Sequence, residues 1–380
     1  MQSMTLHQLH QIVGGRLRLA TLGPRDGEWT HLGRYCADSR QLQPGEIFWA
    51  VQGNVHDGAA FVESAFARGA SGVISTRYVQ PWPGCWALQV EDSREALSKL
   101  ALWHRQQFSG QVVAVGGVAG TATTRRLIST VLGSRFTGTS SPQRDHRQDT
   151  VALGMLSLEP QHDFAVFDFN LSMPGDVGGL VAECGPSIGV ITDVTSPRTA
   201  GTHFSRLHDT ASQLLSQLPE DGHAVLGGDD PAIRRLAEHC RCRTTWVGES
   251  SECDLVATRV LSTDGRLCFD VDGQTFNVAA WGRHQLTSVL CAIGVGRQFG
   301  MSMSEIARAL ACFDLPPDKF DAVPLSIFEP TPVAAGAAAP SILKFKAVTS
   351  PETIVGRLQM AARKILRFDA GHQLTLFRAA

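Results

Sequence analysis

Lysine is scarce in this chain of 380 residues, and none lies between Lys99 and Lys319. In the common phosphate-binding loop, a lysine ammonium group neutralises the outer phosphates of a bound nucleotide. Any such loop in this stretch therefore lacks its main positive charge. Because the stretch spans most of the chain, the shortage limits the chemistry of any nucleotide site that the middle of the sequence forms.

A large net charge and a long apolar run are also missing. The formal charge is −2, which gives no electrostatic reason to expect nucleic acid or a charged membrane surface as a partner. No apolar run is long enough to span a bilayer, and residues 1–15 lack the cationic and then apolar layout of a secretory signal. We therefore expect a cytoplasmic protein that does not insert into membranes.

Cysteine pairs with CxxC spacing are absent as well. The nine cysteines are scattered and include no CxxC pair, which argues against a disulfide framework. One cluster, His239-Cys240-Arg241-Cys242, resembles half of a metal site, but the neighbouring sequence offers no further ligands. We interpret this cluster as structural.

What is present is the composition of an α/β protein. Hydrophobic residues make up 43% of the chain, enough to give two or three domains a core each. The first hundred residues alternate short strands, predicted over residues 46–51 and 72–75, with helices. One helix is capped by Asp57 and a second spans residues 93–108. The first helix is expected to end at Gly69 and to bury Phe61, Val62, Ala65 and Phe66.

Residues 111–126 have the pattern of a strand, a glycine loop and the start of a helix. Gly117 and Gly120 allow the backbone to curl until successive N–H groups face one point, as in a phosphate-binding loop. Thr121 and Ala122 stand where such a loop carries its lysine and its metal-side hydroxyl. The candidate loop residues are Gly117, Gly120, Thr121, Thr123 and Thr124. Taken alone, the pattern fits both a plain strand–turn–helix connection and the remnant of a nucleotide site.

Further strands and helices alternate after this loop. Strands are predicted over residues 164–169, 187–194 and 223–227, and helices begin at Pro174 and Pro231. Such alternation predicts a largely parallel sheet covered on both faces, with ligands beyond the carboxyl ends of its strands.

The last predicted elements are a hairpin and several helices. Alternating strands over residues 254–280 include a turn at Asp272-Gly273, and helices follow over residues 284–299 and 304–313. Residues 324–340 are rich in Pro and Ala and resemble a flexible linker. A helix over residues 350–365 carries an apolar stripe, which either packs against the body of the protein or forms a partner site.

Several of these segments together resemble the Mur ligases. In the first part they are Asp38-Ser39-Arg40, Pro44-Gly45-Glu46-Ile47-Phe48, Gly53, Asp57-Gly58, Phe61, Ala65 and Gly69-Ala70. In the central part they are the glycine loop, Pro174-Gly175-Asp176, Ile188-Gly189-Val190-Ile191-Thr192, Leu218-Pro219-Glu220-Asp221-Gly222, Asp229-Asp230-Pro231 and Gly282-Arg283-His284. They extend over residues 5–320. Within the family, the sequence is most similar to the branch that adds D-alanyl-D-alanine, the MurF branch.

The resemblance implies an α/β enzyme of peptidoglycan precursor synthesis. A UDP-muramoyl-binding domain would span residues 1–109, and a parallel-sheet, ATP-binding domain of the P-loop type residues 110–320. Residues 321–380 would form a linker and an amphipathic helix, a remnant of the third domain. Such an enzyme uses ATP and Mg²⁺ to phosphorylate the peptide carboxylate of UDP-MurNAc-tripeptide, and the amine of D-Ala-D-Ala then displaces phosphate.

The resemblance also implies particular site residues. Ser39, Arg40, Gly53 and Asp57 would bind the UDP-MurNAc-peptide, and Asp229 and Asp230 would lie on the adenosine side. Asp168, which aligns with the family's glutamate on the strand after the loop, is the candidate Mg²⁺ ligand. Asp168 and His284 are the candidate catalytic residues.

The sequence departs from the family where positive charge is required. Thr121 replaces the loop lysine, Arg198 replaces a histidine, and the downstream lysine that the family carbamylates falls near Ala211 or Ser212. Each lost charge-assisted contact is worth about 1.5–3 kcal/mol, so several losses together weaken transition-state stabilisation severely. Arg125 and Arg126 either compensate in part or are solvated on the helix surface.

Three functional hypotheses follow. The chain is a ligase with an altered ATP site, for which we expect little or no ATP-dependent activity. Alternatively, it is a non-catalytic protein that binds a UDP-muropeptide or associates with another cell-wall ligase. A third possibility is a decaying gene product without function. Whether the chain is an enzyme is therefore left open by the sequence.

Overall fold

The computed structural model describes the chain in segments. These are residues 4–20, 32–52, 57–141, 149–171, 177–194, 203–263, 265–313, 328–330, 342–347, 366–368 and 373–377. They fall into two compact units: Met1–Leu261, Cys268–Val278 and Arg283–Phe313 form the first, and Ser262–Leu267, Ala279–Gly282 and Asp314–Ala380 form the second. Across the described segments, no helix is both long enough and apolar enough to cross a membrane.

The first part of the chain forms a five-stranded sheet. Its strands run in the order β1 (Arg16–Leu19), β5 (Trp86–Gln89), β4 (Gly72–Ser75), β3 (Ile47–Trp49) and β2 (Tyr35–Cys36), and only β1 is antiparallel to its neighbour. Side chains alternate between the two faces of a strand. Trp49 and Ile74 therefore pack against the helices of one face, and Phe48 and Val73 against the other.

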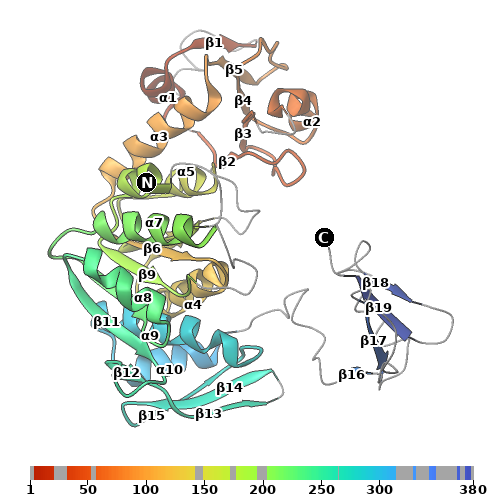
Figure 1. Cartoon of the computed structure of the whole chain (residues 1–380). Helices are drawn as coiled ribbons and strands as arrows, with labels where there is room; N and C mark the ends of the chain where they lie inside the picture. Colours follow the sequence, from red (N-terminus) through yellow and green to blue (C-terminus); the bar gives the residue numbers. More distant parts are fainter. Residues whose placement is uncertain are drawn as a thin grey trace. The chain divides into compact units, whose positions relative to one another are not determined.

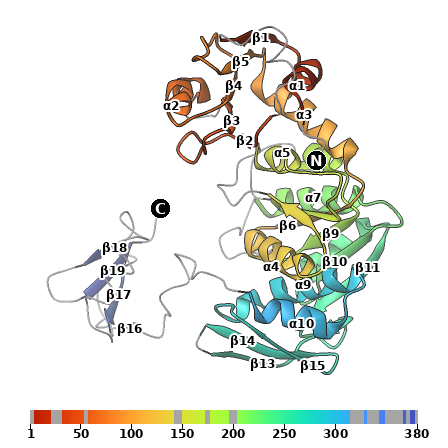
Figure 2. The ribbon, with the colours of Figure 1, turned by 180° about the vertical axis from the view of Figure 1, so that it is seen from behind.

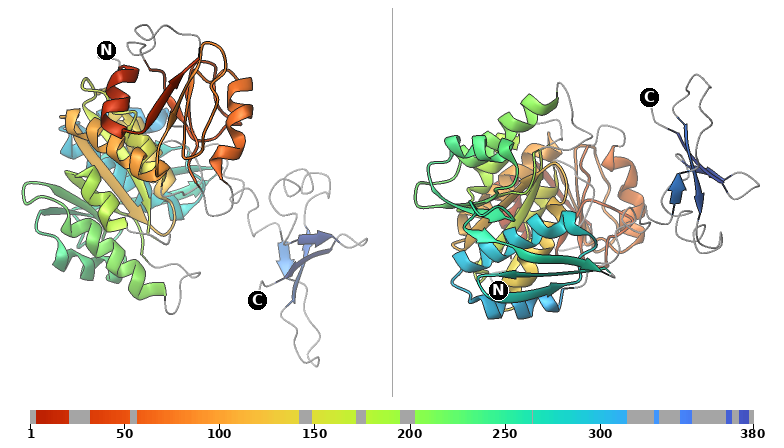
Figure 3. Two further views of the ribbon diagram at one scale, coloured as in Figure 1. Left: turned by 90° about the horizontal axis from the view of Figure 1, so that it is seen from above. Right: turned by 60° about the horizontal axis from the view of Figure 1, so that its bottom comes forward.

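Helices cover both faces of this sheet (Figure 3, left). Helices α1 (Leu6–Val13) and α3 (Ser93–Gln107) cover one face, and the 3-10 turn η1 (Gly58–Phe61) and α2 (Val62–Ala67) cover the other. Asp57 caps η1 as predicted, since its carboxylate accepts a hydrogen bond from the Ala59 N–H. The predicted burial of Phe61 is wrong: this residue is 41% exposed, because it ends the 3-10 turn before α2 begins.

Helix α3 connects the two sheets of the first unit. It packs against α5 (Asp149–Met155) and α6 (Val177–Cys184), which cover the second sheet. The Arg105 guanidinium on α3 donates hydrogen bonds to the carbonyl groups of Phe108, Cys184 and Gly185. One side chain thus binds the end of its own helix and the end of α6.

The second sheet confirms the predicted parallel α/β fold. Seven strands, all parallel, run in the order β12 (Leu255–Val256), β11 (Arg243–Gly248), β10 (His223–Gly227), β9 (Ile188–Ile191), β6 (Gln111–Gly117), β8 (Phe164–Asn170) and β7 (Gly138–Ser140). The chain starts at β6 and adds β8 and β7 on one side and β9 to β12 on the other. In such a sheet, ligands bind at the carboxyl ends of the strands where the order reverses.

Helices cover both faces of this sheet as well. Helices α4 (Thr121–Gly133), α9 (Leu286–Gln298) and α10 (Met303–Ala311) lie on the face toward the viewer in Figure 2. Helices α5, α7 (His203–Ser216) and α8 (Pro231–Leu236) cover the opposite face, which is toward the viewer in Figure 1. The helix predicted to begin at Pro174 is first described at Val177, so its start lies outside the described residues.

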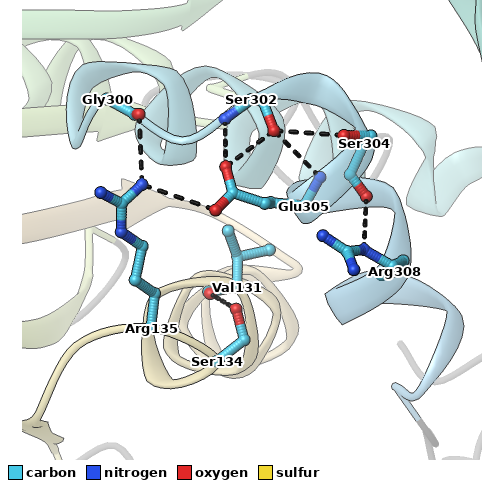
Figure 4. Close-up of polar contacts among 8 residues, drawn as sticks. All are labelled: Val131, Ser134, Arg135, Gly300, Ser302, Ser304, Glu305 and Arg308. Atoms are coloured by element: carbon cyan, nitrogen blue, oxygen red, sulfur yellow. Dashed lines mark hydrogen bonds and ion pairs between the residues drawn. The ribbon is translucent and has the colours of Figure 1, made fainter.

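Polar contacts fix α10 against the end of α4 (Figure 4). Ser302 and Glu305 form a capping box at the start of α10, in which each side chain accepts a hydrogen bond from the backbone of the other residue. Arg135, just after α4, lies 3.6 Å from Glu305 Oε1 and 3.5 Å from the Gly300 carbonyl oxygen. The cap at the start of α10 therefore also orients the Glu305 carboxylate, which pairs with Arg135 just after α4.

The predicted hairpin is confirmed. Strands β13 (Thr258–Thr263), β14 (Arg266–Val271) and β15 (Gln274–Val278) form a three-stranded sheet. Asp272 and Gly273 connect the last two strands with φ angles of 49° and 78°. Positive φ at both positions is the geometry of a two-residue hairpin turn, which explains the Asp-Gly sequence.

The last part of the chain contains a small antiparallel sheet. Its strands are β16 (Phe328–Pro330), β17 (Ile342–Ala347), β19 (Gln373–Phe377) and β18 (Leu366–Phe368), in this spatial order. Strand β16 lies inside residues 324–340, so the linker prediction is wrong for those three residues. The helix predicted over residues 350–365 lies outside the described residues. The division into domains at residues 109 and 320 stays a prediction.

Candidate functional site

The glycine loop lies where the strand order reverses. Strand β6 ends at Gly117, and α4 begins at Thr121 after Gly120, whose φ of +73° favours glycine. A Cβ atom at Gly117 would overlap the Thr192 hydroxyl, so glycine is required there as well. A Cβ atom at Gly120 would lie 3.3 Å from Ser288 Oγ, which places the start of α9 beside the loop.

An aspartate of the chain itself occupies the N–H groups of this loop. Asp193 Oδ1 accepts hydrogen bonds from the backbone N–H groups of Val118, at 3.1 Å, and Ala119, at 3.2 Å. The Thr192 hydroxyl donates to the same oxygen at 3.2 Å. Burial raises the pKa of the Asp193 carboxyl, and the three hydrogen bonds oppose this rise. A carboxylate therefore fills the position in which a nucleotide phosphate would meet these N–H groups.

The hydroxyl groups of the first turn of α4 are enclosed. Thr121, Thr123 and Thr124 are all buried. The Thr124 hydroxyl donates to the Gly120 carbonyl oxygen at 2.9 Å, so its proton is used inside the helix. Thr121, at the position of the family's lysine, brings no charge to the loop.

Asp168, the candidate Mg²⁺ ligand, is paired with a buried arginine. Arg125 Nε lies 3.1 Å from Asp168 Oδ1, in an ion pair whose side chains are only 5% and 11% exposed. Arg125 Nη1 donates to the Ser141 carbonyl oxygen at 2.7 Å and to Ser140 Oγ at 3.2 Å. Burial lowers the pKa of the Arg125 guanidinium, and the neighbouring Asp168 charge opposes that effect. The predicted solvation of Arg125 is wrong.

This arrangement does not fit a divalent metal ion. A Mg²⁺ ion takes oxygen ligands, and here the guanidinium already neutralises the carboxylate it would use. Within the described segments, no three His, Cys, Asp or Glu side chains are grouped so as to hold a metal. Arg198, which replaces a family histidine, lies outside the described residues. Ala211, near the position of the carbamylated lysine, is fully buried in α7.

The two predicted adenosine-side aspartates cap neighbouring backbone. Asp229 accepts hydrogen bonds from the N–H groups of Glu249, at 2.8 Å, and Ser250, at 3.0 Å. Asp230 caps α8 through the Ala232 N–H at 2.8 Å. Both residues follow β10 at the carboxyl edge of the sheet, and their place on the adenosine side stays a prediction.

His284 lies in the 3-10 turn η3 (Arg283–Gln285) that leads into α9. It is exposed, and its Nε2 lies 3.1 Å from Gln285 Nε2. The adjacent Arg283 forms an ion pair with Glu249, with Nε at 3.2 Å from Oε1. This pair joins the turn of His284 to the backbone that Asp229 caps.

The predicted substrate residues of the first part lie in two turns. Arg40 pairs with Asp38 through both carboxylate oxygens, at 3.0 and 2.9 Å, while its side chain stays 79% exposed. Ser39 between them is buried. Asp57 forms an ion pair with Arg77 at 2.5 Å in addition to its cap. Gly53 lies outside the described residues.

Sequence reasoning missed Asp193 and its contact with the loop. Asp193 follows β9, and β9 pairs with β6, so the strand order brings the ends of both strands together. The sequence offered one indication of this contact, a polar residue directly after a buried strand. That indication identifies the contact with the loop only when the strand order is known.

Comparisons with known proteins agree with this fold. The family model for the Mur ligase middle domain matches residues 115–296. The UDP-N-acetylmuramoyl-tripeptide--D-alanyl-D-alanine ligase of Bacillus subtilis is 26% identical over 296 residues, which cover 77% of this chain and 64% of that ligase. The ligase of the same name from Synechocystis is 27% identical over 279 residues, which cover 72% and 60%. The Escherichia coli ligase is 26% identical over 321 residues, which cover 82% and 68%.

Solved structures show the same fold. A crystal structure of MurF from Acinetobacter baumannii superposes with a TM-score of 0.70 at 18% identity, covering 96% of this chain and 78% of that one. MurF ligase from Thermotoga maritima in complex with ADP superposes with a TM-score of 0.62 at 24% identity, covering 76% and 67%. The chain spans less than two thirds of the length of the first two curated relatives, at 64% and 60%. Residues 115–296 thus match the Mur ligase middle domain, and the chain is similar to MurF ligases in sequence and in fold.

Proposed function

We propose that this protein derives from the MurF-type ligases and that its ATP-dependent ligation is impaired or lost. Its relatives are named for joining D-alanyl-D-alanine to UDP-N-acetylmuramoyl-tripeptide, a step of peptidoglycan precursor synthesis that the resemblance assigns to the cytoplasm. The family chemistry brings a carboxylate and a γ-phosphate together, which requires positive charge aimed at both. The proposal concerns whether this chain can supply that charge.

The buried Arg125–Asp168 pair is the observation that carries the proposal. The Arg125 guanidinium, on the helix that follows the loop, is paired with a carboxylate of the chain, and that carboxylate is the one expected to hold Mg²⁺. Releasing either partner would leave a buried charge without its counter-ion, which is costly. The Asp193 carboxylate on the loop adds a repulsive charge where phosphates would bind. Both contacts oppose the binding of Mg·ATP.

A second candidate function is a non-catalytic protein that binds a UDP-muropeptide or associates with a cell-wall ligase. The turn of Asp38, Ser39 and Arg40 supports it, because the bidentate Asp38 contact holds the Arg40 guanidinium in one orientation while leaving the side chain largely exposed. An arginine held in this way is suited to bind the phosphates of a UDP group.

Thermal melting separates these functions from a working ligase. A ligand that binds only the folded state raises the melting temperature, by an amount set by its concentration relative to Kd. UDP-MurNAc-tripeptide is expected to raise it, and Mg·ATP at millimolar concentration is expected to leave it unchanged. Stoichiometric formation of ADP and ligated pentapeptide by the purified protein would overturn the proposal.

Restoring the family's loop residues tests whether their replacement causes the loss of Mg·ATP binding. In the variant Thr121→Lys/Ala122→Thr, combined with Asp193→Ala, the loop regains its positive charge and loses the internal carboxylate. We expect this variant to show a melting shift with Mg·ATP. The same triple variant carrying Thr121→Met in place of Thr121→Lys is the matched control, since it has similar bulk without charge and should show a smaller shift.

A further inference from the structure

Two thiols lie in contact at the amino end of β11, where the 3-10 turn η2 (Ala237–His239) leads into the strand. Cys240 Sγ lies 3.2 Å from Cys242 Sγ and 3.9 Å from the Cys242 carbonyl oxygen. Both side chains are half-buried at the margin of the core. The opposite end of β11 carries the backbone that Asp229 caps, so the candidate nucleotide site does not account for this pair.

The spacing of the pair does not match a zinc site. Two sulfurs on a tetrahedral zinc ion lie about 3.8 Å apart, given a Zn–S distance of about 2.3 Å, and such a site needs two further ligands. The described parts of the chain contain no group of three or more His, Cys, Asp or Glu side chains placed to hold a metal ion. The sulfurs instead lie close enough that a small closing movement brings them to the S–S bond length of about 2.05 Å.

We propose that Cys240 and Cys242 form a reversible intramolecular disulfide, with a low-molecular-weight disulfide such as oxidised glutathione as the oxidant. One protein thiolate attacks the oxidant, whose S–S bond breaks and releases one thiol. The second protein sulfur then attacks the mixed disulfide and displaces the other thiol. Two protein thiols lose their protons and two electrons, and the oxidant gains both as two thiols. This inference is independent of the proposed function.

Either sulfur can make the first attack, because its partner lies 3.2 Å away and can then resolve the mixed disulfide. Burial raises the pKa of the Cys242 thiol, which slows its oxidation at neutral pH. The exposed Arg241 and Arg243 flank the pair in sequence, and cations near a cysteine favour its thiolate.

A tryptic map reads out the bond directly, because Arg241 lies between the two cysteines. The full-length protein is treated with oxidised glutathione at neutral pH, alkylated, and digested without reduction. Trypsin releases residues 236–241 and residues 242–243 as separate peptides unless a disulfide joins them. We expect the joined species, lighter than the sum of the two peptides by two hydrogen masses, and its loss after treatment with dithiothreitol.

Serine variants test the two steps. Cys242→Ser and Cys240→Ser should each trap glutathione on the remaining cysteine, because the thiol that resolves the mixed disulfide is missing. Cys312→Ser, at an exposed cysteine just after α10, is the matched control and should retain the joined peptides. Separate peptides with both thiols intact, glutathione on both cysteines, or a disulfide between two chains would each overturn the proposal. The tryptic map of the unmodified sequence decides the question even if a variant does not fold.

Discussion

The apolar core of the seven-stranded sheet and the carboxyl edge of that sheet differ in how their side chains are stabilised. Two consecutive residues of β8 show the difference. Phe167 faces the apolar core and is fully buried, while Asp168 faces the opposite side and pairs with Arg125. The residues of the core are buried, as a stable fold requires. The edge satisfies its charges internally, whereas a site that handles ATP must leave cations available for its ligand. The same sheet therefore combines a buried apolar core with an edge whose charges are paired within the chain.

The largest expected effect comes from breaking the edge at Arg125. Arg125→Ala leaves the Asp168 carboxylate buried without its partner and should lower the free energy of unfolding by about 3–5 kcal/mol. That equals the cost of about 3–5 kcal/mol expected for Phe167→Ala in the core. Urea unfolding measures both. The matched control is Arg126→Ala, on the same helix, whose guanidinium lies 5.5 Å from the Phe313 ring and should matter much less.

An apolar replacement sharpens the same comparison. Arg125→Met/Asp168→Leu removes both charges and should recover most of the stability lost in Arg125→Ala, since replacing a buried pair by apolar residues is often close to neutral. The double variant could instead have a free energy of unfolding as low as that of Arg125→Ala. That result would mean that side-chain packing or the contacts with Ser140 and Ser141 stabilise the protein more than the paired charges do.

A smaller effect is expected at Asp193. Asp193→Ala removes the acceptor for two loop N–H groups and should cost about 1–3 kcal/mol in urea unfolding. Adding inorganic pyrophosphate should restore part of this loss, because an external anion can then reach the loop. The parent protein, tested in parallel, should gain nothing from pyrophosphate. Equal stabilisation of both proteins would show that the anion binds elsewhere.

The cap of α10 offers a test away from the site. Ser302→Ala removes the side chain that accepts from the Glu305 N–H and should cost about 1 kcal/mol. Arg135→Ala, which removes the partly exposed pair with Glu305 and the long contact with the Gly300 carbonyl oxygen, should cost between about 0 and 1 kcal/mol. Thermal unfolding of the two variants side by side separates the cap from the ion pair. The reverse ranking would contradict this assignment.

The smallest effect concerns pH. Burial lowers the pKa of His104 on α3, while a hydrogen bond with the Leu158 backbone opposes this shift. The unfolded chain therefore binds more protons between the folded pKa and about 6.5, so stability rises with pH across that window and falls on acidification. The urea midpoint should be lower at pH 5 than at pH 7.5. His104→Gln should reduce this difference, and an unchanged difference would exclude His104 as its source.

The sequence predicted features that depend on local chemistry. The Asp272-Gly273 turn, the Asp57 cap, the helix that begins at Pro231 and the glycine loop all follow from residues close together in the chain. Phe61 was placed wrongly because a short 3-10 turn changes which residues face the sheet. Apolar periodicity cannot distinguish such a turn from the first turn of an α-helix.

The contacts that define the site could not be predicted in this way. Asp193 and the loop N–H groups are separated by 75 residues, and they meet only because β9 lies beside β6. Arg125 reaches Asp168 because α4 packs on β8. Alternation of strands and helices indicates a parallel sheet but not its strand order. The missing lysine was visible in the sequence, while the contacts of Arg125 and Asp193 were not.

Arg105 has a mechanical consequence. Because its guanidinium holds carbonyl groups on both α3 and α6, rotating the first sheet against the second would break hydrogen bonds to a charged group, each worth about 1.5–3 kcal/mol. Arg105 therefore opposes bending at the junction between α3 and α6. Any hinge motion that opens or closes a ligand cleft is therefore more easily accommodated elsewhere in the chain.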